Sequence, residues 1–238
     1  MSGFELLVVE PSGWAGAVAE LLADRLRSKP ALRLCLPTGD TPVPVFDAIV
    51  ELAAGGTCSF GAATVVQLDE WVGLPPGDPA RCDTRLRAQL LERLAPAPAA
   101  WLFDVDAASL DEAVAHQAAE AARLDLVLLG LGMNGHVGFN EPGSGPEEVT
   151  RIVRLAASSR EAATARYGAA AVPAGGVTIG LAEILAAGEI WLLVTGERKA
   201  GILRRTLREP VGLDCPASHL RRHAALRVFV DTEAASLL

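Results

Sequence analysis

A glycine-rich segment in the middle of the chain places a histidine and a glutamate shortly after a run of apolar residues. The run 124–129 has the composition of a buried strand, and His136 and Glu141 follow it. Ligands of open α/β sheets bind outside the carboxyl ends of the strands, so both side chains are expected at a ligand site. An imidazole there could transfer protons near neutral pH, with Glu141 folding back to orient it. The alternative is an ordinary glycine-rich connection with an incidental histidine.

Two adjacent carboxylates follow a second apolar run, at residues 62–68. Asp69 and Glu70 stand at its end. One of them could act as a general base if the other points away to a structural partner. The alternative is a helix cap or a pair of surface acids.

A short turn after a third apolar run, 32–36, has the composition of an anion-binding loop. It contains Thr38, Gly39, Asp40 and Thr41, and a predicted helix follows it. Backbone N–H groups of such a turn, together with a helix N-terminus, bind anions. The Lys-Ser/Thr ending of a nucleotide-binding loop is missing, so nucleotide phosphates are not implied. An ordinary turn with Thr41 as the N-cap is the alternative.

Lys199 falls in the first turn of a predicted helix, directly after the apolar run 189–195. A cation is unfavourable at the N-terminus of a helix. Lys199 is therefore predicted to face an anion, although solvated lysines are common.

The segments around these residues alternate between strand-like and helix-like patterns. Repeated β-α units predict an α/β fold, with a doubly wound, mostly parallel sheet and helices on both faces, in the manner of a Rossmann fold. No internal repeat or clear linker divides the chain, so residues 1–238 are predicted to form a single domain. We expect strands at 4–9, 32–36, 62–68, 101–105, 124–129, 152–155, 177–179, 189–195 and 226–230, and helices at 14–26, 44–54, 84–94, 110–123, 159–167 and 197–207.

The overall charge limits the classes of partner. The net charge is −8 and the pI is about 5.1, which argues against nucleic acid and against anionic membranes as partners. The same charge would repel a phosphorylated metabolite, so a phosphate site must be a local cluster of donors. No apolar run reaches the ~20 residues that a membrane helix needs.

The four cysteines are scattered without paired spacing, which is typical of reduced thiols and a cytoplasmic location. Cys215, His219 and His223 are spaced by four, like zinc ligands on one helical face. Pro216 argues against a regular helix through Cys215, and no fourth ligand is near in the sequence. A structural role is favoured for these residues, and no metal site is predicted.

Taken together and in this order, the four fragments resemble the glucosamine-6-phosphate deaminase/isomerase family, within the superfamily that also holds 6-phosphogluconolactonases. The resemblance extends from Leu6 to Val230. Lactonases keep the Gly-x-x-Gly-His turn but not the Phe-Asn-Glu-Pro that follows it here. The matching motifs are Pro37-Thr-Gly-x-Thr-Pro42, Leu68-Asp-Glu-Trp-Val-Gly-Leu74, Gly132-x-Asn-Gly-His-Val-Gly-Phe-Asn-Glu-Pro142 and Gly196-x-x-Lys199.

The resemblance implies aldose-ketose isomerisation and deamination of an amino-sugar 6-phosphate, to the ketohexose 6-phosphate and ammonia, without a cofactor. Asp69 matches the base that moves a proton between C2 and C1 of the open-chain sugar. His136 matches the group that opens the pyranose ring, and Glu141 its carboxylate partner. Asn134 stands at a catalytic position where many members have an aspartate. The Gly-Met-Asn-Gly-His form looks closer to the galactosamine-6-phosphate branch, and the sugar could be either epimer.

The resemblance also implies how the rest of the substrate is held. Arg160 is the alternative to Arg166, because Arg166 aligns only with a one-residue slip. Asp40 replaces a glycine that is usual in the phosphate turn, so its carboxylate must point away from the phosphate. The residues expected to bind substrate or phosphate are Thr38, Gly39, Asp40, Thr41, Glu70, Gly135, Ser144, Arg151, Arg166 and Lys199.

Two other functions fit some of these features. One is a 6-phosphogluconolactonase, which is a plain ester hydrolase. The other is a sugar-phosphate-binding regulator without catalysis, against which the intact set of Asp69, His136 and Glu141 argues, because a sensor needs only the phosphate anchor. The chain is expected to be a monomer or a small homo-oligomer.

Overall fold

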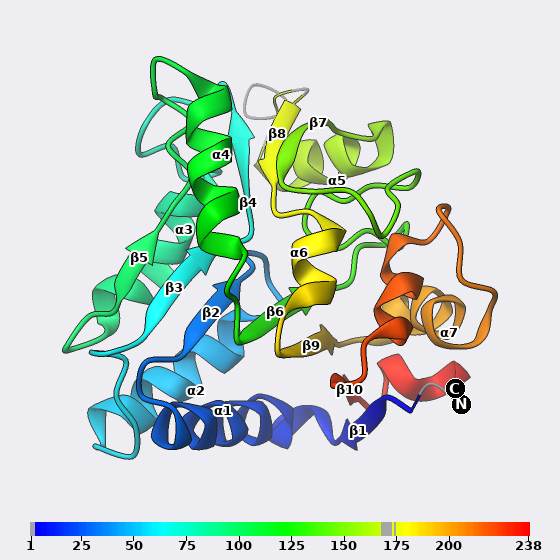
Figure 1. Cartoon of the computed structure of the whole chain (residues 1–238). Helices are drawn as coiled ribbons and strands as arrows, with labels where there is room; N and C mark the ends of the chain where they lie inside the picture. The colour runs from blue at the N-terminus through cyan, green and yellow to red at the C-terminus, as the bar shows by residue number, and fades with distance from the viewer. Residues whose placement is uncertain (1–2, 168–172, 174) are drawn as a thin grey trace.

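A parallel sheet runs through the centre of the molecule (Figure 1). The computed structural model describes residues 3–167, 173 and 175–238. Within them the sheet has seven strands, and every neighbouring pair is parallel, which confirms the predicted fold class. In spatial order the strands are β1 (Glu5–Val9), β10 (Leu226–Asp231), β9 (Glu189–Val194), β6 (Leu126–Gly130), β2 (Arg33–Leu36), β3 (Thr64–Gln67) and β5 (Ala99–Trp101).

Both faces of this sheet are covered, because its central strands are apolar on both sides. Along β6, Leu126 and Leu128 belong to one buried cluster, together with side chains of helices α1 (Pro11–Ser28), α2 (Val43–Ala54) and α3 (Cys82–Gln89). Val127 and Leu129 belong to the cluster on the other face, with α4 (Leu110–Ala121), α6 (Leu181–Ala186) and α7 (Ala200–Arg208). Figure 1 shows α1 and α2 beneath the sheet and α4 and α6 above it.

The strand order reverses between β2 and β6. The chain runs outward from β2 through β3 to β5, and outward in the other direction from β6 through β9 to β10, beyond which the N-terminal strand β1 forms the edge. Ligands bind at such a switch point, outside the carboxyl ends of the strands. The strands β9, β6, β2 and β3 are consecutive neighbours in the sheet. The segments that follow them, at its carboxyl edge, contain Lys199, His136, Thr38 and Asp69, respectively.

A second, antiparallel sheet lies beside this edge, and sequence patterns did not predict it. In the described residues it consists of β4 (Asp69–Val72), β8 (Gly175–Thr178) and β7 (Arg151–Arg154), in that order. The strands expected at 152–155 and 177–179 are present as β7 and β8, but they belong to this second sheet. Alternation along a strand reveals its buried face but not the strand with which it pairs.

The other predicted boundaries differ from the observed ones by a few residues, except for one strand that overlaps its predicted range at a single residue. The strand expected at 101–105 is β5 at Ala99–Trp101. The helix expected at 84–94 is α3 followed by a 3-10 turn, η1 (Leu91–Arg93). The remaining elements are α5 (Ala157–Tyr167), η3 (Glu197–Lys199), η4 (Pro216–Arg222) and η5 (Ala234–Leu237). Among the described residues, no helix is long and apolar enough to cross a membrane.

Candidate active site

The turn after β6 holds His136 against a glycine. The Gly132 N–H donates to the carbonyl oxygen of His136 at 2.9 Å, and the Gly135 N–H donates to that of Gly132 at 3.1 Å. A methyl carbon added at Gly132 would lie 2.5 Å from Cδ2 and Cε1 of the imidazole. The ring therefore occupies the space that any other side chain at position 132 would need.

Gly135, which was expected to contact substrate, has a structural role in this turn. Its φ is 87°, and an added Cβ would lie 2.7 Å from Sγ of Cys215. Its carbonyl oxygen accepts a hydrogen bond from the Ala217 N–H at 2.9 Å. Gly135 thus packs the turn onto the segment that begins η4.

Glu141 returns to the imidazole, as the sequence suggested. Its Oε2 lies 3.4 Å from Nδ1 of His136 and accepts a hydrogen bond from Nδ2 of Asn134 at 2.9 Å. Oδ1 of Asn134 accepts one from the backbone N–H of His136 at 3.2 Å. Oγ of Ser159, on α5, lies 3.3 Å from Nδ1 of His136. Nothing in the sequence singled out Ser159, because its contact with His136 depends on the position of α5.

The carboxylate of Glu141 is held ionised by these neighbours. Burial alone would raise its pKa, but hydrogen bonds with His136, Ser159 and Asn134 and the charge of a protonated His136 outweigh burial and lower the pKa. An ionised Glu141 favours one orientation of the imidazole and stabilises it when protonated. At Asn134, where an aspartate would add a second negative charge, the amide instead donates a hydrogen bond to Glu141.

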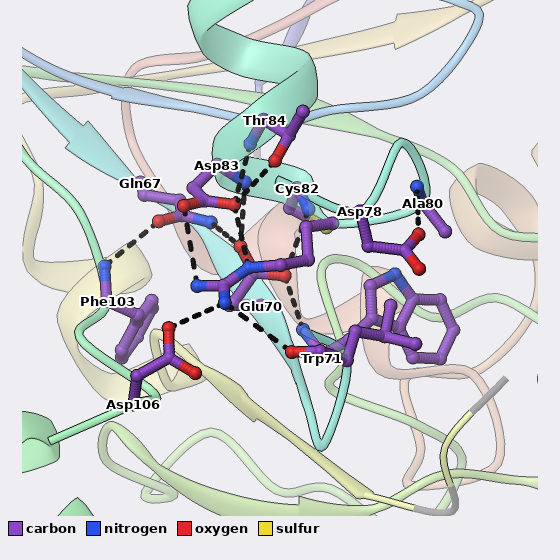
Figure 2. Close-up of polar contacts among 12 residues, drawn as sticks. Gln67, Glu70, Trp71, Asp78, Ala80, Cys82, Asp83, Thr84, Phe103 and Asp106 are labelled. Carbon is purple, nitrogen blue, oxygen red and sulfur yellow. Dashed lines mark hydrogen bonds and ion pairs between the residues drawn. The ribbon is translucent and has the colours of Figure 1, made fainter. Parts of the chain in front are cut away.

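Glu70 is buried, and its carboxylate accepts four hydrogen bonds (Figure 2). Its Oε1 accepts from the N–H groups of Trp71 at 2.7 Å and Cys82 at 2.9 Å. Its Oε2 accepts from the Asp83 N–H at 2.7 Å and from Nε2 of Gln67 at 2.9 Å. The carboxylate therefore caps the N-terminus of α3, where a negative charge is favourable. This differs from the substrate contact expected for Glu70, because its lone pairs are already used.

Asp69, by contrast, is not used to cap a helix. Burial and the negative charge of Glu70 raise the pKa of Asp69 to about 7, while Arg85 and the Cys82 thiol act in the opposite direction. A carboxylate with such a pKa can accept and return a proton near neutral pH. The sequence did not point to Arg85.

The two parts of the site meet through β8. Asp69 pairs with Thr178 across the antiparallel sheet. Oγ1 of Thr178 accepts a hydrogen bond from the N–H of Phe139 at 3.1 Å. Because Phe139 follows His136 by one turn of chain, the second sheet ties the segment with Asp69 to the segment with His136.

In the turn after β2, the Val43 N–H at the start of α2 donates to the carbonyl oxygen of Asp40 at 3.2 Å. Pro42, rather than Thr41, is the N-cap of α2, and no side chain caps this helix end. Gly39 has a φ of 143°. Nη2 of Arg85 donates to the carbonyl oxygen of Gly39 at 3.3 Å. Pro42 and Pro44 have no N–H group, so an anion here would depend on the N–H groups of the turn more than on the start of the helix.

The expected phosphate anchor is split between two places. Nζ of Lys199 donates to the carbonyl oxygen of Leu131, and burial and Arg198 lower its pKa. Lys199 and Met133 line a cavity of about 520 Å³. Arg151 and Ser144 line a separate cavity of about 300 Å³.

Arg151 is already paired where it lies. Its Nη1 donates to Oδ1 of Asn140 at 3.0 Å, its Nη2 to Oγ of Ser144 at 2.9 Å, and its Nε lies 3.1 Å from the carboxylate of Glu148. Arg151 and Lys199, which were expected to share one anchor, thus line different cavities here. Arg160 is exposed on α5, and the Arg166 side chain lies outside the described residues.

The three residues with zinc-like spacing have other surroundings. Nε2 of His223 lies 2.8 Å from the carbonyl oxygen of Ala187, and its Nδ1 accepts from the Ala225 N–H at 3.1 Å. His219 is buried. Across the described part of the chain, no three His, Cys, Asp or Glu side chains gather as metal ligands would.

Comparisons with known proteins agree with this geometry. A model of the family described as glucosamine-6-phosphate isomerases/6-phosphogluconolactonase matches residues 12–229. A glucosamine-6-phosphate deaminase of Rhodopirellula baltica is 38% identical, over 98% of this chain and 94% of the relative. One of Pseudarthrobacter chlorophenolicus is 39% identical, over 92% of this chain and 86% of the relative.

Solved structures extend the comparison to the fold. A monomeric glucosamine-6-phosphate deaminase of the NagB superfamily has a TM-score of 0.92 at 29% identity, and the match covers 99% of this chain and 100% of that one. A 6-phosphogluconolactonase of Thermotoga maritima has a TM-score of 0.76 at 19% identity, covering 97% of this chain and 100% of that one. At that identity, the lactonase shares the fold alone.

Proposed function

The chain belongs to the family of glucosamine-6-phosphate isomerases and 6-phosphogluconolactonases, and we propose that it converts glucosamine-6-phosphate to the ketohexose 6-phosphate and ammonia. The observation that carries this proposal is the different surroundings of two adjacent carboxylates. Glu70 is saturated by four hydrogen bonds, whereas Asp69 is a buried carboxylate with a pKa of about 7. An aldose-ketose isomerase needs such a base, and ester hydrolysis does not need proton transfer between carbons.

In the proposed reaction, His136 first moves a proton at the ring oxygen, and the pyranose opens to the aldehyde. Asp69 then removes the proton from C2 while the C1 oxygen gains one, which produces an enolamine. Asp69 returns its proton to C1, so that the double bond moves to C2 as an imine. Water adds at C2, ammonia leaves, and the ketone remains. Glu141 supports the charge that His136 carries during ring opening.

Lys199 and the turn 38–41 are proposed to hold the phosphate. The turn before α2 would supply backbone N–H and hydroxyl donors, and Lys199 supplies a positive charge on a strand end two places along the sheet. Anchoring the far end of the sugar would fix C1 and C2 against Asp69. Arg151 and Ser144 are proposed to order the segment after Glu141, because both are occupied there.

The glucosamine epimer is preferred to galactosamine because the relatives compared are named for glucosamine-6-phosphate. All four cysteines are free thiols, which supports a reducing, cytoplasmic compartment. The solved relative is described as monomeric, and we propose the same state here, within one domain spanning residues 1–238.

The test is a side-by-side measurement of ammonia release from glucosamine-6-phosphate and galactosamine-6-phosphate, with hydrolysis of 6-phosphogluconolactone as a second assay. Faster ammonia release from glucosamine-6-phosphate is expected. Lactone hydrolysis without ammonia release would favour the lactonase. Binding of the sugar phosphate without either reaction would favour the non-catalytic regulator.

A further inference from the structure

Arg85 lies where the phosphate turn meets the segment with Asp69. It is half-buried on α3, one helical turn after Cys82, and residues three apart share a face of a helix. The start of α3 is fixed by the Glu70 carboxylate, which accepts the N–H groups of Cys82 and Asp83 (Figure 2). From that position Nη2 of Arg85 reaches the carbonyl oxygen of Gly39 at 3.3 Å.

The charge of the same guanidinium acts on the Asp69 carboxylate. The pKa of Asp69 is shifted by burial and by three described groups, which are Glu70 on its own strand and Cys82 and Arg85 on α3. Cys35 on β2 also lies within electrostatic range of Asp69. Burial raises the pKa of both thiols well above its usual value, so both stay neutral. In this described set, Arg85 is the cation that opposes Glu70.

We propose that Arg85 is a positioning residue of the active site, which joins the turn at Gly39 to α3 and supplies a positive charge beside the segment that holds Asp69. This rests on the proposed function in one respect, that Asp69 is the base. The guanidinium acts through two contacts of different kinds, a hydrogen bond to Gly39 and a charge interaction with Asp69. A lysine can replace the charge, but it cannot reproduce the planar fork of donors.

The experiment compares Arg85→Gln and Arg85→Lys with wild type, and Arg87→Gln serves as the control. Arg87 lies on the same helix but is exposed. We would measure kcat and KM for ammonia release between about pH 5.5 and about pH 9. Removing the cation should raise the pKa of Asp69, so the acid limb of kcat/KM should move to higher pH by about 0.5 to 1 unit.

R85Q should therefore lose roughly 3- to 10-fold in kcat/KM near pH 6 and much less near pH 9, because one pKa unit is a factor of ten in protonation. R85K should recover the acid limb but keep any rise in KM that comes from the loss of the guanidinium hydrogen bond to Gly39. R87Q should match wild type. A second neutral variant, R85M, replaces R85Q if that variant does not fold, as judged by circular dichroism.

A titration without substrate separates this inference from the proposed function. The carboxyl ¹³C resonance of Asp69, assigned as the signal missing in D69N, would be followed against pH in wild type and R85Q. A higher midpoint in R85Q supports the role of Arg85 even if no ammonia is released, in which case only the proposed function fails. An unchanged Asp69 midpoint in R85Q would overturn the inference.

Discussion

The contact between Gly132 and His136 makes Gly132→Ala a sharp test of the site. The added methyl carbon would lie 2.5 Å from Cδ2 and Cε1 of the imidazole, whereas carbon atoms in contact normally stay about 3.5 Å apart. The ring must therefore retreat by about 1 Å. Gly132 is not one of the glycines with positive φ, so the backbone itself accepts alanine.

This shift would disturb the contacts that hold the imidazole in its position. Nδ1 of His136 is already 3.4 Å from Oε2 of Glu141 and 3.3 Å from Oγ of Ser159, which leaves no margin for a hydrogen bond after such a shift. A misplacement of about 1 Å in a catalytic group typically costs about 100-fold in rate. We expect a loss of that order in kcat for G132A, with little change in thermal stability.

Gly130→Ala is the matched control, because an added Cβ at Gly130 meets no atom within 4 Å. Ammonia release and thermal melting would be measured for both variants. If G132A melts like G130A and keeps its kcat within about threefold of it, the imidazole at this position does not take part in the rate-limiting chemistry and the reasoning fails.

Three further outcomes follow from the charges at the site. Asp69→Asn should bind substrate but lose about 10²- to 10⁴-fold in kcat, because an amide cannot take the C2 proton; normal turnover would remove Asp69 as the base. The folded-state pKa of Asp69, about 7, lies above its usual value, so its contribution to stability is lost as pH rises through the range from about 4 to about 7. D69N should therefore raise Tm by several degrees near pH 8 and much less near pH 4, and equal Tm shifts in thermal melts at the two pH values would contradict the burial of an ionised carboxylate. Lys199→Ala should raise KM for the phosphorylated sugar far more than Arg151→Ala, because the Arg151 side chain is already paired with Asn140 and Glu148. Lys29→Ala, which removes an exposed ion pair with Asp125, serves as the control in steady-state kinetics. A larger KM effect for R151A would place the phosphate at the other cavity.

Local patterns determined the parts of the protein that depend on neighbouring residues. The apolar runs and the glycine turns predicted the β-α alternation, the parallel sheet and the edge at which His136, Glu141 and Asp69 open. These predictions succeed because a buried strand needs apolar residues throughout, and because the residue after such a strand must leave the sheet at its carboxyl end. Gly132 also marks its turn directly, since a side chain there would overlap the imidazole of His136 in the same turn.

Only the tertiary structure decided which of two chemically similar residues takes which role. Asp69 and Glu70 are both carboxylates in sequence, and the start of α3, twelve residues after Glu70, makes Glu70 a helix cap and leaves Asp69 subject to the charge of Arg85. Arg151 and Lys199 are both cations that could bind phosphate, and the antiparallel pairing of β7 with β8 places Arg151 at a different cavity from Lys199. Such choices depend on which segments pair across long stretches of chain, and a pattern read along one segment carries no information about its partner.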